Sequence, residues 1–126
     1  MARKEDAEVL RRRAVEFLEA ARDDIRAGRY DLAAFHCEQA TQLALKHFLA
    51  KELGYFPRTH DLRELIELAG KIKPSLQDLY EEFKFEIEVM LDAYVGARYL
   101  PRSYRRDVVE KLYSVAERVV REVGVN

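Results

Sequence analysis

Five glycines divide this chain into segments that each carry the apolar period of an α-helix. They are Gly28, Gly54, Gly70, Gly96 and Gly124, and a proline follows three of them, at positions 57, 74 and 101. Glycine often occupies the residue after the end of a helix, and a proline just beyond it prevents the helix from resuming. The spacing therefore predicts helices that end or bend at the glycines.

The predicted helices cover most of the chain. They span residues 4–27, 31–53 and 60–69, then a stretch from after Ser75 to Gly96, then a stretch that follows Ser103. Asp31 and Thr59 are the predicted N-caps, because their side chains can accept a hydrogen bond from the first helical turn. Strand signals are nearly absent. We expect an all-α, up-and-down antiparallel bundle of four long helices and one short helix, in one domain over residues 1–126.

The last predicted helix carries two adjacent apolar stripes. One consists of Val108, Leu112, Val115, Val119 and Val123, and the other of Val109, Tyr113, Ala116 and Val120. A single bundle contact requires only one such stripe. Two interpretations follow: the surplus stripe packs in a homodimer, or the helix lies centrally and buries both stripes within the chain.

Composition limits the class of protein. The chain has 22 basic and 23 acidic residues, a net charge of −1, which argues against a protein that coats nucleic acid but allows a local basic patch. The lone cysteine, the lack of an apolar run of about 20 residues and the polar N-terminus predict a cytoplasmic protein without a membrane span or signal peptide. Scarce amide side chains and a charged fraction of 36% are typical of a thermophile.

A polar stripe follows the second predicted helix. His36, Gln39, Leu43 and Lys46 recur at spacings of three and four, so they share one face of an otherwise apolar helix. The stripe either lines a polar cleft that binds a ligand or forms the solvated edge of the helix.

A second candidate site lies where the fourth long helix ends. The apolar period that reaches Tyr94 next falls on Arg98, so we expect this arginine to point inward and to need an anionic partner. Arg102 follows closely, and the basic, aromatic surroundings suit phosphate or nucleotide contacts. The alternative is a structural tie between Arg98 and a carboxylate beside a solvated run of charges.

The other reactive side chains predict no metal, cofactor or catalytic site. His36 and His47 lie about 16 Å apart along one helix at 1.5 Å per residue, and no paired Cys/His spacing occurs. Cys37 lies in an apolar helix and is predicted to be an inert core thiol. His60 is interpreted first as part of a helix start, with a functional role as the alternative.

Two segments together resemble the HEPN domain family, whose name refers to nucleotide binding in higher eukaryotes and prokaryotes. They are DLAAFHCEQATQLALKHFLAKELGYFPRTHDLRELI, residues 31–66, and LDAYVGARYLPRSY, residues 91–104. The residues that match are Ala34, Gln39, Ala40, Leu45 and Lys46, then Thr59 to Leu62, then Tyr94, Arg98 and Tyr99.

The resemblance implies an all-α bundle that forms a homodimer. It also implies a minimal nucleotidyltransferase as partner, as in toxin–antitoxin pairs. Many HEPN proteins are metal-independent ribonucleases with an R-x(4–6)-H motif. After Arg98, however, the positions for that histidine hold Ser103, Tyr104 and Arg105. Arg29 and His36 fit the spacing, but at the wrong place in the chain, and we treat them as a chance match.

The leading hypothesis is a non-catalytic component of a nucleotidyltransferase/HEPN system that binds a nucleotide, RNA or its protein partner. One alternative is a ribonuclease toxin with a degenerate site, and a second is a purely structural helical adaptor. The candidate ligand-binding residues are His36, Gln39, Lys46, Tyr94, Arg98, Arg102 and Tyr104.

Overall fold

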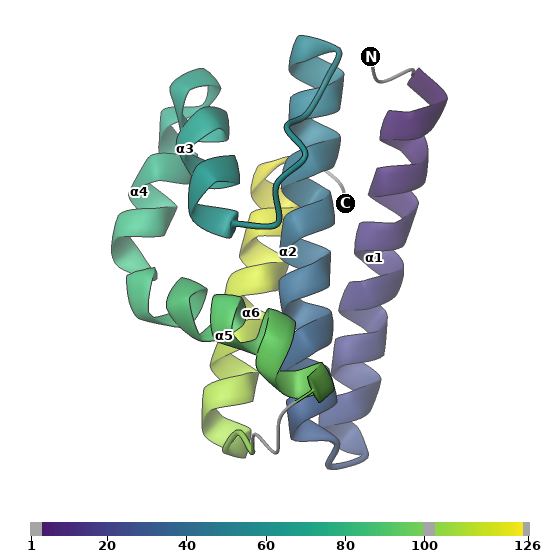
Figure 1. The fold of residues 1–126 in the computed structure, drawn as a ribbon, viewed down its shortest axis with the longest axis vertical. Coiled ribbons are helices and arrows are strands. Elements are labelled where there is room, and N and C mark those ends of the chain that lie inside the picture. Colours follow the sequence, from purple (N-terminus) through teal and green to yellow (C-terminus); the bar gives the residue numbers. More distant parts are fainter. Residues whose placement is uncertain (1–3, 100–102, 125–126) are drawn as a thin grey trace.

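The computed structural model describes residues 4–99 and 103–124, and at residues 4, 5, 97 and 98 the backbone alone. Six helices occupy this part of the chain, and it contains no strand (Figure 1). They are α1 (Lys4–Arg26), α2 (Tyr30–Leu53), α3 (Leu62–Ile72), α4 (Pro74–Glu82), α5 (Lys84–Tyr99) and α6 (Arg106–Glu122). The prediction of an all-α fold is confirmed. None of the described helices is both long and apolar enough to cross a membrane.

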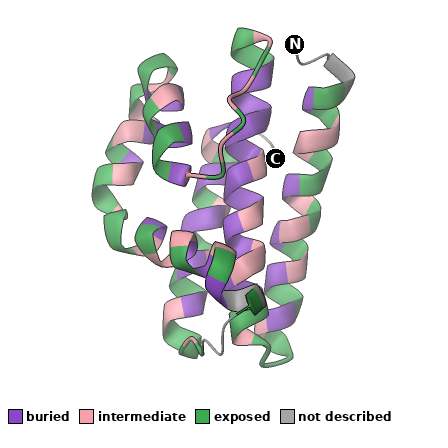
Figure 2. Cartoon of the chain, in the orientation of Figure 1, coloured by how far each residue is buried: buried purple, intermediate pink, exposed green. Residues whose placement is uncertain are grey.

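Helix α2 forms the centre of the bundle. It contacts α1, α3, α5 and α6, and α1 runs beside it in the opposite direction (Figure 1). Most of its second half is buried, as the colours of Figure 2 show. Helices α3 and α4 lie to one side, and α5 crosses the lower part of the bundle. The largest fully buried side chains come from five helices and include Leu45, Leu49, Leu65, Ile66, Leu76, Ile87, Met90 and Leu112.

Two helix starts differ from the prediction. The N-cap of α3 is Asp61 and not Thr59, because the Asp61 carboxylate accepts the Arg63 N–H at 2.9 Å. The Thr59 hydroxyl instead accepts the N–H of Asp61 at 3.1 Å, so it orders the turn before the helix. Asp31 is likewise not an N-cap. It lies in the first turn of α2, where a negative charge favours the positive end of the helix dipole.

The predicted fourth long helix is two helices. Helix α4 ends at Glu82, and α5 begins at Lys84. Between them, Phe83 has a φ of −116° and a ψ of 32°, outside the helical region. Two cations of α6 lie over the Phe83 ring, with Lys111 Nζ at 5.2 Å and Arg118 Cζ at 5.5 Å from its centroid. The break has no glycine or proline to signal it. Tertiary packing therefore sets the point where the chain turns from α4 across the bundle.

The glycines play two different roles. Gly28, Gly54 and Gly124 have φ between 75° and 79° and follow the ends of α1, α2 and α6, as predicted. Gly70 and Gly96 lie inside α3 and α5, so the prediction that helices end there is wrong. A Cβ at Gly70 would lie 3.2 Å from Gln77 Cβ, which shows that α3 and α4 approach closely at this position. Pro101 lies outside the described residues.

Helix α6 decides between the two interpretations of its stripes. Its buried residues come from both stripes: Val109, Leu112, Val115, Ala116, Val119 and Val120. Since α1, α2, α4 and α5 all contact α6, both stripes are buried within the chain. The apolar surplus of this helix is therefore no longer an argument for a homodimer.

Candidate functional site

A fully buried carboxylate lies in the middle of α2. Glu38 has 0% of its surface exposed. Its Oε1 accepts a hydrogen bond from Gln39 Nε2 at 2.7 Å, and its Oε2 accepts one from Gln42 Nε2 at 2.8 Å. A buried charge is tolerated only where such groups replace its hydration. Glu38 thus lies at the centre of a hydrogen-bonded polar cluster inside the bundle.

Gln42 connects Glu38 to the loop before α3. Its side-chain oxygen lies 3.1 Å from His60 Nδ1. An ionised carboxylate only accepts hydrogen bonds, so the NH₂ group of Gln42 faces Glu38 and its oxygen faces His60. The histidine nitrogen therefore donates. The link joins residues 18 positions apart in the sequence.

The His60 ring stacks on Tyr94 of α5. The two ring centroids are 5.1 Å apart and the planes differ by 21°, an arrangement typical of offset stacking. Tyr94 is half-buried and His60 is exposed. The contact brings a predicted site residue of α5 against a histidine that was not among the candidate binding residues.

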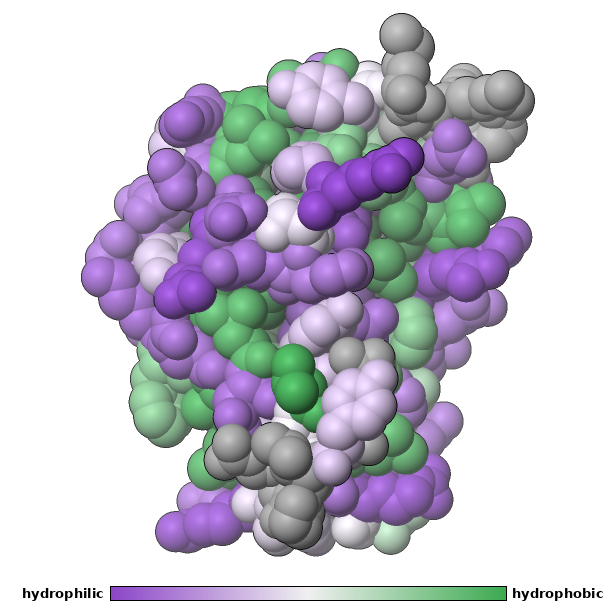
Figure 3. All heavy atoms as spheres, viewed as in Figure 1, coloured by the Kyte–Doolittle hydropathy of each residue, from purple (hydrophilic) through white to green (hydrophobic). Residues whose placement is uncertain are grey.

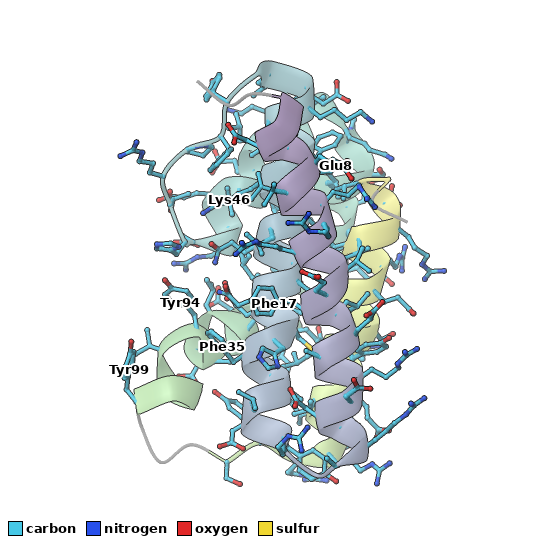
Figure 4. The ribbon with its side chains drawn as sticks, turned by 90° about the vertical axis from the view of Figure 1, so that its right-hand side faces the viewer. Glu8, Phe17, Phe35, Lys46, Tyr94 and Tyr99 are labelled. Carbon is cyan, nitrogen blue, oxygen red and sulfur yellow. The ribbon has the colours of Figure 1, made fainter. Side chains whose placement is uncertain are left out.

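Lys46 adds a positive charge to the same cluster. Only 7% of its surface is exposed, and its Nζ lies 5.7 Å from the centroid of the Phe56 ring. Burial lowers the pKa of Lys46, and the negative charge of Glu38 acts against that shift. Figure 4 shows Lys46 and Tyr94 on the same side of the bundle, away from Glu8. We call Glu38, Gln39, Gln42, Lys46, His60 and Tyr94 the Glu38 cluster.

The polar stripe on α2 is not a solvated edge. His36, Gln39 and Leu43 are half-buried and Lys46 is buried. Gln39 and Lys46 belong to the Glu38 cluster, whereas His36 belongs to a separate group nearer the start of α2.

That separate group closes the turn between α1 and α2. Asp24 is 3% exposed, and its carboxylate lies 2.5 Å from His36 Nδ1 and accepts the Arg29 Nε–H at 3.1 Å. The Asp24 carbonyl also accepts the N–H of Arg29. Arg29 and His36 therefore do meet in space, on one buried carboxylate that ties two helices together. The predicted binding residue His36 is a part of this tie.

A comparison with protein-family models identifies the chain. A model of the HEPN domain matches residues 7–126. This chain is a HEPN-domain protein. The match includes every helix that contributes to the Glu38 cluster. A search of curated proteins finds no match.

The remaining predicted residues of this HEPN domain, Arg98, Arg102 and Tyr104, lie in the last turn of α5 or follow it in the sequence. Tyr104 is half-buried, and its hydroxyl donates to Asp92 Oδ2 at 2.6 Å. The backbone of Arg98 lies in α5, one turn after Tyr94, but its side chain and the whole of Arg102 lie outside the described residues. That Arg98 points inward and that Arg102 binds a ligand thus remain predictions.

Two further features of the described residues concern metal binding and the reactivity of the thiol. Among the described residues, no group of three or more His, Cys, Asp or Glu side chains is placed to hold a metal ion. Cys37 is fully buried, and burial, with the charge of Asp24, raises the pKa of its thiol. It is an inert core thiol, as predicted.

Sequence reasoning missed Glu38, Gln42 and the site role of His60. One signal for Glu38 was available, because a charged residue in the most apolar stretch of a central helix must have polar partners. No local pattern pairs Gln42 with His60, since that contact depends on how the loop at residues 54–61 returns along α2.

Proposed function

We propose that this HEPN domain binds a nucleotide at the Glu38 cluster without catalysing a reaction. We also propose that it serves as the binding component of a nucleotidyltransferase/HEPN system of toxin–antitoxin type. One observation carries the first proposal: two predicted residues, Gln39 and Tyr94, share one hydrogen-bonded and stacked cluster with His60. A third, Lys46, is buried where the charge of Glu38 acts on its pKa.

The chemistry of the cluster supports a nucleotide as ligand. Tyr94 and His60 provide stacked rings, and nucleobases stack readily on aromatic side chains. Lys46 supplies a desolvated cation, which attracts a phosphate more strongly than a hydrated one does. Arg98, one turn after Tyr94 in α5, remains the candidate for a second phosphate contact.

The ribonuclease alternative has less support. Tyr104 stands at a position of the motif histidine, and its hydroxyl already donates to Asp92. A phenol with an ordinary pKa near 10 is a poor base at neutral pH. Incubation of the protein with RNA in the presence of a chelator tests this alternative directly.

Titration with AMP, GMP, CMP and UMP, followed by NMR, tests the nucleotide site. The test variant is Lys46→Met, which keeps the length of the side chain and removes its charge. The variant no longer buries an ammonium group, but it also loses the attraction to Glu38, and urea unfolding measures the balance of these two effects. We expect nucleotide affinity to fall about tenfold, because the buried positive charge of the Glu38 cluster is lost.

Lys51→Met is the matched control, since Lys51 lies on the same helix but is exposed. Its nucleotide affinity should equal that of the wild type. Equal affinities for Lys46→Met and wild type, or no shift with any of the four nucleotides, would rule out the proposed site.

Co-purification tests the partner. The full chain, expressed with the genes that neighbour its own, should retain a minimal nucleotidyltransferase through size-exclusion chromatography. If the nucleotidyltransferase elutes separately at micromolar concentrations of both proteins, the partner proposal is wrong.

HEPN domains often dimerise, and we propose that this one forms a homodimer through α5. Its exposed face carries Phe85, Val95 and Tyr99, with exposed fractions of 68%, 48% and 71%. Green spheres among purple ones mark apolar side chains over this region in Figure 3. Such side chains on one helix face favour association.

Charge complementarity favours a second copy as the occupant of this face. Glu88 and Asp92 lie on the same face of α5 as Val95 and Tyr99, at spacings of three and four. Exposed basic residues, Arg105 and Arg106, follow the helix. Two copies of α5 that cross in opposite directions bring the acidic part of each toward the basic part of the other, as a two-fold axis requires.

A further inference from the structure

We infer that His60 recognises a hydrogen-bond donor of the bound nucleotide through its Nε2 atom, and that Glu38 and Gln42 position it for this role. The inference rests on the nucleotide binding proposed above and specifies which ligand groups the site selects.

The direction of each hydrogen bond is fixed from Glu38 outward. The carboxylate only accepts, so Gln42 turns its NH₂ group toward Glu38 Oε2 at 2.8 Å. Gln42 consequently presents its oxygen to His60 Nδ1 at 3.1 Å, and Nδ1 must carry the hydrogen. In the neutral ring the lone pair then lies on Nε2.

The stack on Tyr94 fixes the plane of the same ring. Since the planes differ by 21° and Nδ1 is bonded to Gln42, His60 has little freedom to flip its ring. The residue is nevertheless exposed. Nε2 is therefore the ring nitrogen that remains for a ligand, and in the neutral ring it accepts a hydrogen bond.

An acceptor at this position selects among the groups of a nucleotide. Phosphate oxygens only accept at neutral pH and gain nothing from the neutral ring, so Lys46 remains the phosphate contact. Ribose hydroxyls donate, and so do the exocyclic amines of adenine, cytosine and guanine and the ring N–H groups of guanine and uracil. We therefore expect the site to prefer ribonucleotides that offer such a donor to His60.

The first measurement concerns the protein without ligand. Long-range ¹H–¹⁵N NMR correlations of the neutral ring should show His60 protonated at Nδ1 and unprotonated at Nε2. A His60 ring protonated at Nε2 instead would overturn the inference whatever the nucleotide does.

The second measurement compares AMP with three analogues, each of which lacks one donor: 2′-deoxy-AMP, 3′-deoxy-AMP and purine riboside monophosphate. We expect one of them to bind about fivefold to tenfold more weakly than AMP, the range of one hydrogen bond. The analogue that binds more weakly identifies the donor that contacts His60, which is either a ribose hydroxyl or the amine of the base.

The test variant is His60→Asn, whose side-chain NH₂ replaces Nδ1–H toward Gln42 and has no counterpart of Nε2. It should bind AMP and the weaker analogue equally. His60→Gln, which retains a polar atom near Nε2 but loses the bond to Gln42, is the comparison variant and should also lose the preference, because its amide is no longer held in place.

The outcomes distinguish nucleotide binding at the Glu38 cluster from the specific role of His60 in that binding. Equal binding of AMP and all three analogues to the wild type, or a preference that survives in His60→Asn, refutes the role of His60 alone. No binding of any nucleotide refutes the proposed function itself, and the role of His60 in ligand recognition with it.

Discussion

Cys37 and Glu38 are neighbours in α2 and both are fully buried, yet burial affects them differently. Glu38 has amide donors on both oxygens, so its charge is stabilised inside the bundle. Cys37 has the negative charge of Asp24 nearby, and burial together with that charge raises the pKa of its thiol. The two neighbouring positions therefore differ in their polar surroundings, although both are fully buried.

The raised pKa of Cys37 predicts a loss of stability in alkaline solution. Above about pH 9 the thiol of the unfolded chain loses its proton while the folded thiol keeps it, so the folded state binds more protons and stability falls as pH rises. The free energy of unfolding should fall by up to about 1.4 kcal/mol per pH unit from this group. Urea unfolding at several pH values from 8 to 10.5, on the scale of ordinary thiol titration, measures the slope.

Cys37→Ala is the variant that isolates this effect. Its stability at neutral pH should fall by about 1 kcal/mol, since a small buried side chain becomes smaller. Its slope above pH 9 should be shallower than that of the wild type. Parallel slopes for the two proteins would show that the thiol does not contribute.

At the scale of helices, the contact between α3 and α4 depends on Gly70. A Cβ at this position would meet Gln77 Cβ at 3.2 Å and the Gln77 backbone nitrogen at 3.4 Å. These atoms belong to the body of α4, so they cannot move aside without the helix. The close approach explains why a residue of low helix propensity lies within α3.

Gly70→Ala should therefore destabilise the protein, although alanine favours a helix by about 1 kcal/mol. We expect a net loss of about 1–2 kcal/mol in the free energy of unfolding, since overpacking at a close contact outweighs that gain. Urea unfolding followed by circular dichroism measures it. Lys71→Ala, at the exposed next position of α3, should change stability by less than about 0.5 kcal/mol. A stabilised Gly70→Ala variant would show that α4 shifts to accommodate the methyl group.

At the scale of the whole molecule, three of the exposed large apolar side chains lie on one face of α5. The apolar stripes of α6 are buried within the chain, whereas Phe85, Val95 and Tyr99 of α5 are exposed. The homodimer proposed through α5 would bring the Glu38 cluster close to the interface, because Tyr94 belongs to the same helix.

Val95→Glu should shift the protein from dimer to monomer. A carboxylate at the centre of the proposed interface adds repulsion to Glu88 and Asp92 of the same face and must be desolvated, so the dimer should weaken at least about tenfold. Light scattering after size-exclusion chromatography measures the mass. Ile72→Glu, at an exposed apolar residue that ends α3, is the control and should leave the mass unchanged. A monomeric wild type at all concentrations, or a Val95→Glu variant that remains a dimer, contradicts the proposed interface.

The sequence alone determined the helical class, the family and most helix ends. These features depend on contacts within one or two turns, such as the apolar period of α6 or the left-handed conformation at Gly28 and Gly54. Local patterns suffice for them because the interactions that produce them are local. The same patterns placed Gln39, Lys46 and Tyr94 among the candidate residues.

Only the tertiary structure decided where the fourth helix breaks and which polar residues meet. Phe83 interrupts the predicted helix because the chain must turn to pack α5 across α2, and no local preference of that residue signals the break. Hydrogen bonds connect Glu38, Gln42 and His60 in series, because the loop before α3 returns along α2. That contact links residues distant in the sequence, so its free energy depends on the packing of the whole bundle rather than on any segment of it.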